Sequence, residues 1–130
     1  MILVDTSVWV DHLRKNDLIL TGLLERRDVL VHPWVTSELA LGNLHNRDEI
    51  LELLTTMPQA PKIDHETVLE FIDQERLYGL GIGLVDVHLL ASTRALPNTL
   101  LWTRDRRLGQ VAARLGYRYD EETSGAVPAE

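Results

Sequence analysis

The stretch ILVDTSVWVD, residues 2–11, places a short apolar run directly before an acid and a helix start. The apolar run Ile2–Val4 is typical of a parallel strand that is buried on both faces. Asp5 and the two hydroxyl residues after it are all good N-cap residues, so we expect a helix from there to about Leu13. A strand followed by an acid and a helix indicates an α/β protein.

Three further acids follow the same local pattern, in which an apolar run ends and a helix begins: Glu38, Asp86 and Asp105. Glu38 and Asp105 follow the runs DVLVH and TLLWT, and Asp86 follows the glycine-rich run GLGIG. Ligands of open α/β sheets bind in the crevice outside the carboxyl ends of the strands. We therefore expect these three acids and Asp5 to converge at one edge of the sheet.

The rest of the chain alternates between strand and helix signals. Strands are predicted at 28–32 and 99–103, with an edge strand at 117–119. Helices are predicted at 18–25, from Pro33 through Glu38, around 50–57, and at 65–78, 85–95 and 105–116. This alternation predicts a mainly parallel sheet of four or five strands, covered on both faces. We expect one domain over residues 1–119 and an acidic tail without regular structure over residues 120–130.

The composition excludes several kinds of site. The chain of 130 residues has no cysteine, which excludes a disulfide framework, a thiol nucleophile and a thiolate metal site. The N-terminal segment has no basic region and reaches Asp5 almost at once, so we expect neither a signal peptide nor a membrane span. We expect a cytoplasmic protein.

The net charge of −7 is unevenly distributed along the chain. Four acids lie in the tail after residue 119 and four in the candidate site, and setting these eight aside leaves a charge of +1. Eleven of the thirteen basic residues are arginines, and five of these lie between residues 104 and 118. Planar guanidinium groups suit phosphate recognition, so we expect Arg104 or Arg106 to hold a phosphate. A solvated helix face is the alternative interpretation of these arginines.

A cluster of carboxylates without basic partners needs a counter-charge. Two carboxylates about 4 Å apart repel by roughly 4 kcal/mol at an effective dielectric constant near 20. A hard divalent cation removes this repulsion, and ligands that are all oxygen favour Mg²⁺ or Mn²⁺ over zinc. Helix capping is the alternative for each acid taken alone. Capping fits Asp105 best and Glu38 least, because glutamate is a poor cap residue.

Four segments of the chain resemble, in the same order, the signature segments of PIN-domain ribonucleases, specifically the VapC-type toxins of prokaryotic toxin–antitoxin pairs. They are ILVDTSVWVD (2–11), HPWVTSELALGNL (32–44), GIGLVDVHLLAS (81–92) and LWTRDRRLGQVAARLG (101–116). The resemblance implies a PIN-like three-layer α/β/α fold and a metal-dependent endoribonuclease that leaves a 5′-phosphate and a 3′-hydroxyl. It also implies a homodimer that is silenced by a small cognate antitoxin of the VapB type.

The family's four acids match, in chain order, Asp5, Glu38, Asp86 and Asp105. We predict the first three as the principal ligands of Mg²⁺ or Mn²⁺, and the fourth as a ligand of a second metal or an outer-shell acid. By the same resemblance, Thr6 and Thr103 are hydroxyls that orient carboxylates or metal-bound water. Ser7 stands where many relatives have asparagine, and this difference leaves the four acids in place.

Other functional classes fit the sequence less well. A response-regulator receiver domain needs a late lysine, but the two lysines of this chain are Lys15 and Lys62. A dehalogenase-type phosphatase needs Asp-x-Asp near the start, where this chain has Asp5-Thr6-Ser7. A catalytically idle PIN-like module that binds RNA or protein remains as the alternative, and a metal-dependence assay on RNA distinguishes the two.

The histidines and tryptophans are interpreted as packing or surface residues. The five histidines show no zinc-ligand spacing such as His-Glu-x-x-His. Trp9, Trp34 and Trp102 each lie in an apolar run, so packing is favoured over base stacking.

Overall fold

A parallel sheet with the strand order β2-β1-β3 forms the centre of the protein. In the computed structural model, which describes residues 1–126, the strands are β1 (Ile2–Val4), β2 (Val29–Leu30) and β3 (Leu100–Trp102). The central strand β1 pairs Ile2 with Val29 on one side and with Leu100 on the other. All three residues of β1 are buried, as expected for the middle strand of a covered parallel sheet.

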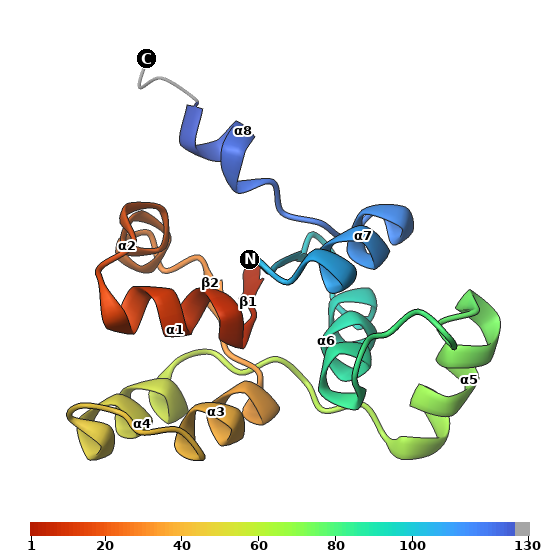
Figure 1. Ribbon diagram of the computed structural model, residues 1–130, viewed down its shortest axis with the longest axis horizontal. Helices are drawn as coiled ribbons and strands as arrows, with labels where there is room; N and C mark the ends of the chain where they lie inside the picture. The colour runs from red at the N-terminus through yellow and green to blue at the C-terminus, as the bar shows by residue number, and fades with distance from the viewer. Residues whose placement is uncertain (127–130) are drawn as a thin grey trace.

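Helices cover both sides of these strands. Within the described residues they are α1 (Thr6–Arg14), α2 (Leu18–Glu25), α3 (Pro33–Ala40), α4 (Arg47–Thr56), α5 (His65–Glu75), α6 (Leu84–Ala95), α7 (Arg106–Leu115) and α8 (Glu121–Ala126). Figure 1 shows α1 to α4 on one side of the strands and α5 to α7 on the other, with α8 near the C-terminus. The predicted α/β architecture with a parallel sheet is therefore confirmed.

The prediction of four or five strands was wrong, because the structure has three strands within residues 1–126. The segment 117–119, predicted as an edge strand, makes a single parallel bridge to Leu101. The Leu101 amide donates to the Tyr117 carbonyl at 2.7 Å, and the Tyr119 amide donates to the Leu101 carbonyl at 2.9 Å. The pairing extends no further because Asp120 already caps the next helix by accepting from the Glu122 amide at 3.1 Å.

The start of the tail is helical, where the sequence predicted no regular structure over residues 120–130. Helix α8 packs near α2, and its Glu121 forms an ion pair with Arg104 at 2.7 Å. The prediction treated the tail by its composition alone and did not consider this partner. Residues 127–130 lie outside the described residues.

The core lies between the sheet and the inner faces of the helices. Leu3, Val4, Leu101 and Trp102 are fully buried. Trp9 is also buried, which agrees with the packing interpretation, whereas Trp34 is 42% exposed. None of the helices within residues 1–126 is long and apolar enough to cross a membrane.

Candidate active site

Asp5 lies at the carboxyl end of the central strand and is 5% exposed. Its amide donates to the Trp102 carbonyl at 2.9 Å, so the backbone still follows the sheet at this point. Its side chain then caps α1. The short strand β1 thus delivers a carboxylate to the edge of the sheet, as the sequence predicted.

One oxygen of Asp5 is held by two hydroxyl groups. Asp5 Oδ2 accepts from Ser7 Oγ and from Thr103 Oγ1, both at 2.7 Å, and from the Ser7 amide at 3.4 Å. Within residues 1–126, Oδ1 of Asp5 makes no hydrogen bond that competes for it. The hydroxyls therefore fix the direction of the carboxylate and leave its second oxygen available for another ligand.

Ser7 is the residue that the sequence interpretation undervalued. Besides holding Asp5, Ser7 Oγ accepts from the Arg104 amide at 3.0 Å and lies 3.4 Å from Thr103 Oγ1. It therefore joins the ends of β1 and β3. The sequence signal for this role of Ser7 was its position two residues after Asp5. A hydroxyl at this position can donate a hydrogen bond to the side chain of the capping acid.

Thr103 connects two of the candidate acids. Its hydroxyl donates to Asp5 and accepts from the Asp105 amide at 3.0 Å. Asp105 is exposed and caps α7 by accepting from the Leu108 amide at 2.9 Å. The capping alternative for Asp105 is thus present in the structure, and one free carboxylate oxygen remains on the same side chain.

Glu38 reaches the site from α3, which begins at Pro33 with His32 as its N-cap. Glu38 is exposed, and its Oε1 accepts from Thr6 Oγ1 at 2.5 Å. This short hydrogen bond connects α3 with the start of α1. The predicted orienting hydroxyl Thr6 therefore contacts Glu38, and the hydroxyls that hold Asp5 are those of Ser7 and Thr103.

Asp86 lies in the first turn of α6 and is partly buried. Its Oδ2 accepts from the Gly83 amide at 3.0 Å. Burial raises the pKa of Asp86, the Gly83 amide opposes this, and the charges of three nearby carboxylates raise it further. These three belong to Asp5, Asp105 and Glu38. Three of the predicted acids, which come from separate elements, thus lie close enough to act electrostatically on the fourth, Asp86.

The acids converge without forming a closed cage. Among residues 1–126, no group of three or more acidic or histidine side chains is close enough together to hold a metal ion by itself. Coulomb forces act beyond ligand distances, so this spacing agrees with the effect of the acids on Asp86. Mg²⁺ is commonly bound by one or two carboxylates together with water and substrate phosphate oxygens. A set of carboxylate oxygens whose charges raise the pKa of Asp86 fits such an ion.

Arg104, predicted to bind phosphate, is already surrounded by acids. Its guanidinium contacts Asp11 at 2.9 Å, Asp17 at 2.5 Å and Glu121 at 2.7 Å. These partners raise its pKa, with the Glu121 hydrogen bonds as the largest cause. Phosphate would have to displace these carboxylates. The structure therefore favours Arg106, which is exposed at the start of α7, over Arg104 as a phosphate ligand.

The sequence was compared with known protein families and curated proteins. The model of the PIN domain matches residues 2–114, which include all four acids. The chain belongs to the PIN-domain family. This PIN domain is 45% identical over 124 residues to the protein named ribonuclease VapC32 from Mycobacterium tuberculosis strains CDC 1551 / Oshkosh and ATCC 25618 / H37Rv. The alignment covers 95% of this chain and 100% of each relative. The resemblance stated from the sequence is confirmed.

Proposed function

We propose that this PIN domain is a Mg²⁺- or Mn²⁺-dependent endoribonuclease, the toxin of a toxin–antitoxin pair. The observation that carries the proposal is the convergence of four acids from separate elements, which raises the pKa of Asp86 by burial and by mutual repulsion. A carboxylate with a raised pKa that lies among other acids near the carboxyl edge of a parallel sheet is typical of a functional site. The similarity to ribonuclease VapC32 supports RNA as the substrate.

Each acid has a distinct task in this proposal. Asp5, Glu38 and Asp86 bind the metal directly or through water, and Asp105 serves a second metal or the outer shell. A bound Mg²⁺ or Mn²⁺ supplies an activated water and neutralises charge on the phosphate that is attacked.

The hydroxyl residues keep the acids in position. Ser7 and Thr103 prevent Asp5 from rotating, and Thr6 does the same for Glu38. These contacts fix the direction of the carboxylates, which suits them to bind an ion.

The partners follow from the same proposal. We propose that the protein forms a homodimer in the cytoplasm and is inhibited by a VapB-like antitoxin. Within residues 1–126, large apolar side chains remain exposed on several helices and loops, among them Leu18 (85%), Leu41 (88%) and Leu84 (64%). Exposed apolar side chains of this size can pack against a partner chain. A monomer in light scattering at micromolar concentration, both alone and after co-expression with the neighbouring reading frame, would argue against both partners.

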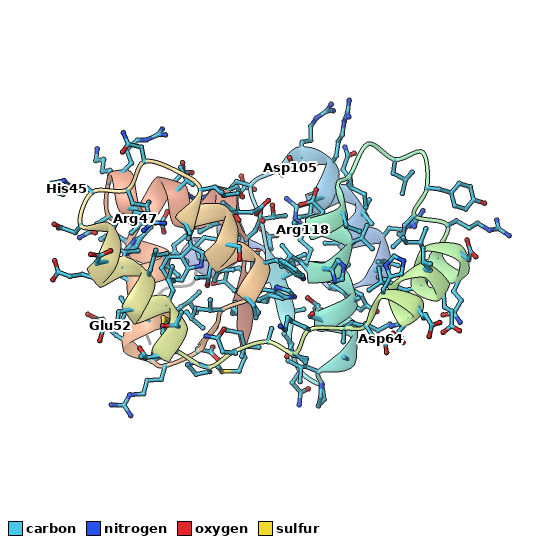
Figure 2. All side chains as sticks on the ribbon, turned by 90° about the horizontal axis from the view of Figure 1, so that it is seen from below. His45, Arg47, Glu52, Asp64, Asp105 and Arg118 are labelled. Carbon is cyan, nitrogen blue, oxygen red and sulfur yellow. The ribbon has the colours of Figure 1, made fainter. Side chains whose placement is uncertain are left out.

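The central experiment compares aspartates that cap helices inside and outside the site. Asp5→Asn and Asp86→Asn keep the size and capping ability of the side chain but remove the charge that a metal requires. Asp64→Asn is the matched control, because Asp64 caps α5 by accepting from the Thr67 amide at 2.7 Å. Figure 2 shows Asp64 well apart from Asp105.

We expect wild type and Asp64→Asn to cut RNA with Mg²⁺ or Mn²⁺ and to stop when EDTA is added. Asp5→Asn and Asp86→Asn should fold, as judged by circular dichroism, and lose nearly all cleavage. Asp105→Asn should lose less, because its assigned place is the outer shell or a weaker second metal. Undiminished cleavage in EDTA, or by Asp5→Asn, would refute the proposed mechanism.

A further inference from the structure

A polar hollow of about 320 Å³ lies next to the acids, on the side of Asp105. Its walls come from the start of α7 and from the segment that returns to β3 after α7. The lining residues that matter here are Thr103, Asp105, Arg106, Gly109, Gln110 and Arg118. We refer to it as the Arg118 pocket. Figure 2 shows Asp105 and Arg118 in the same part of the molecule.

The pocket contains two arginines that are not neutralised by contact with acids. Within residues 1–126, neither Arg106 nor Arg118 has an acid within 4 Å, although Asp120 lies within electrostatic range of Arg118. Arg104, which also lines the pocket, is neutralised by its three carboxylate partners. In a chain with a net charge of −7, two available guanidinium groups beside an acidic site form a local attraction for an anion.

Gly109 lines the pocket without a side chain of its own. It lies in the interior of α7, where glycine costs about 1 kcal/mol relative to alanine. A Cβ atom at this position would lie 3.8 Å from Thr103 Cγ2 and 4.0 Å from Arg118 Nε and Cζ. A methyl group would therefore fit without a clash but would occupy the space between these two walls. A side chain here would reduce the space beside the Arg118 guanidinium.

The pocket is continuous with the candidate active site. Thr103 forms part of its wall, and the Thr103 hydroxyl donates a hydrogen bond to Asp5. Asp105 stands between the pocket and the other acids. An RNA strand whose scissile phosphate lies at the acids would therefore place a neighbouring nucleotide over α7.

We propose that the Arg118 pocket binds the backbone phosphate of the RNA nucleotide next to the scissile bond, with Arg106 and Arg118 donating to its oxygens. This inference rests on the proposed ribonuclease function and adds a binding residue, Arg118, from a segment outside the four signature stretches. Asp105, which lines the pocket together with Glu121, repels this phosphate. This repulsion falls when Asp105 is engaged by a cation, so metal and RNA binding support each other.

The test separates RNA binding from the chemical step. Arg118→Ala and Arg106→Ala are compared with Arg26→Ala, which removes an exposed arginine at the end of α2, outside the pocket. Cleavage of total cellular RNA gives kcat and KM. Binding is measured by fluorescence anisotropy with a labelled single-stranded RNA oligonucleotide, using the same arginine variants in the Asp5→Asn background.

We expect each pocket variant to raise KM and Kd about tenfold, because a charge-assisted contact to phosphate is lost. The value of kcat should stay within about twofold, and the dependence of log Kd on log salt should decrease by about one. Arg118→Lys should recover part of the affinity. Gly109→Ala should melt at an equal or higher temperature and yet bind RNA more weakly, an outcome that loss of structure cannot produce.

The outcomes distinguish this inference from the proposed function. If wild type does not cut RNA with Mg²⁺ or Mn²⁺, the proposed function fails and the inference fails with it. If wild type cuts RNA while Arg118→Ala matches Arg26→Ala in KM, Kd and salt dependence, the inference alone is overturned. A fall in kcat at unchanged Kd would likewise overturn it, because it would place Arg118 in the chemical step.

Discussion

His32 is expected to make the stability of this protein depend on pH below neutrality. The side chain is fully buried and lies between α3 and α6. Its Nδ1 accepts from the Trp34 amide at 3.0 Å, which requires that Nδ1 carries no proton. Ser92 Oγ donates to the Pro61 carbonyl at 2.6 Å, so Ser92 Oγ accepts from His32 Nε2 at 3.1 Å. The neutral Nε2–H form therefore satisfies every partner.

The pKa of His32 is lowered from 6.5 to about 4, first by burial and then by the charges of His88 and Lys62. A histidine with a lowered folded-state pKa takes up a proton more readily in the unfolded state. The contribution of neutral His32 to the free energy of unfolding is therefore present above pH 6.5 and is lost as the pH falls towards 4. From 1.36 kcal/mol per pKa unit, the loss is about 2 kcal/mol at pH 5 and about 3 kcal/mol at pH 4. Protonation also removes the N-cap of α3, the helix that carries Glu38.

The assay is urea unfolding of wild type and His32→Asn from pH 7 to pH 4. Asparagine keeps an N-cap acceptor and does not titrate, so the variant should be less stable at pH 7 because it loses packing and the Ser92 contact. This difference should shrink by about 2 kcal/mol at pH 5, while groups common to both proteins cancel. Nitrogen NMR of wild type at pH 7 should show the Nε2–H tautomer. Parallel pH curves, or the Nδ1–H tautomer, would refute the reasoning.

Two further predictions concern the segment that carries Asp86. Asp86→Asn should raise the melting temperature in EDTA at pH 7, because the raised pKa of Asp86 means that the fold disfavours its charged form. This gain should decrease as the pH is lowered, because the Asp86 carboxylate of wild type then becomes protonated. A gain that persists unchanged at pH 3 would contradict this origin. Gly81→Ala should destabilise the fold more than Gly79→Ala. Both residues have positive φ, but only at Gly81 would a Cβ contact a neighbour, the Arg107 side chain, whose guanidinium would have to move away. The double variant Gly81→Ala/Arg107→Ala should remove most of the difference in urea unfolding, and equal stabilities of the two single variants would refute the contact.

Much of the fold could be predicted because local signals and tertiary structure agree. The boundaries of α2 were predicted to the residue, and Gly116 ends α7 with φ of +80° as a C-cap glycine should. Helix α5 ends at Glu75, whereas the sequence predicted it to Tyr78. The apolar spacing continues through Leu77, but Arg76 adopts the left-handed conformation and ends the helix. Arginine gives no sequence signal for such a turn.

The acids were easier to predict than their surroundings. Asp5 follows β1 and Asp105 follows β3, and the parallel pairing of these strands brings both acids to one edge of the sheet. The contacts of Arg104 and Ser7 depend on side chains that are far apart in the sequence, such as Glu121 for Arg104 and Thr103 for Ser7. Spacing within one segment carries no information about such pairs. For the same reason, the sequence could not predict how far residues 117–119 pair with β3. That segment makes two backbone hydrogen bonds to Leu101, which form a bridge and not a strand.

The position of β1 in the middle of the sheet has a consequence for the growing chain. The Thr103 hydroxyl that holds Asp5 is 98 residues away from it in sequence, and β3 supplies one whole side of β1. At translation rates of about 5–20 residues per second, the first acid waits about 5–20 s before its partner is synthesised. A nascent or prematurely terminated chain that lacks β3 also lacks Thr103 and Asp105, so its Asp5 is not held and the fourth acid is missing. The four acids of the candidate site can therefore come together only after residue 105 has been synthesised.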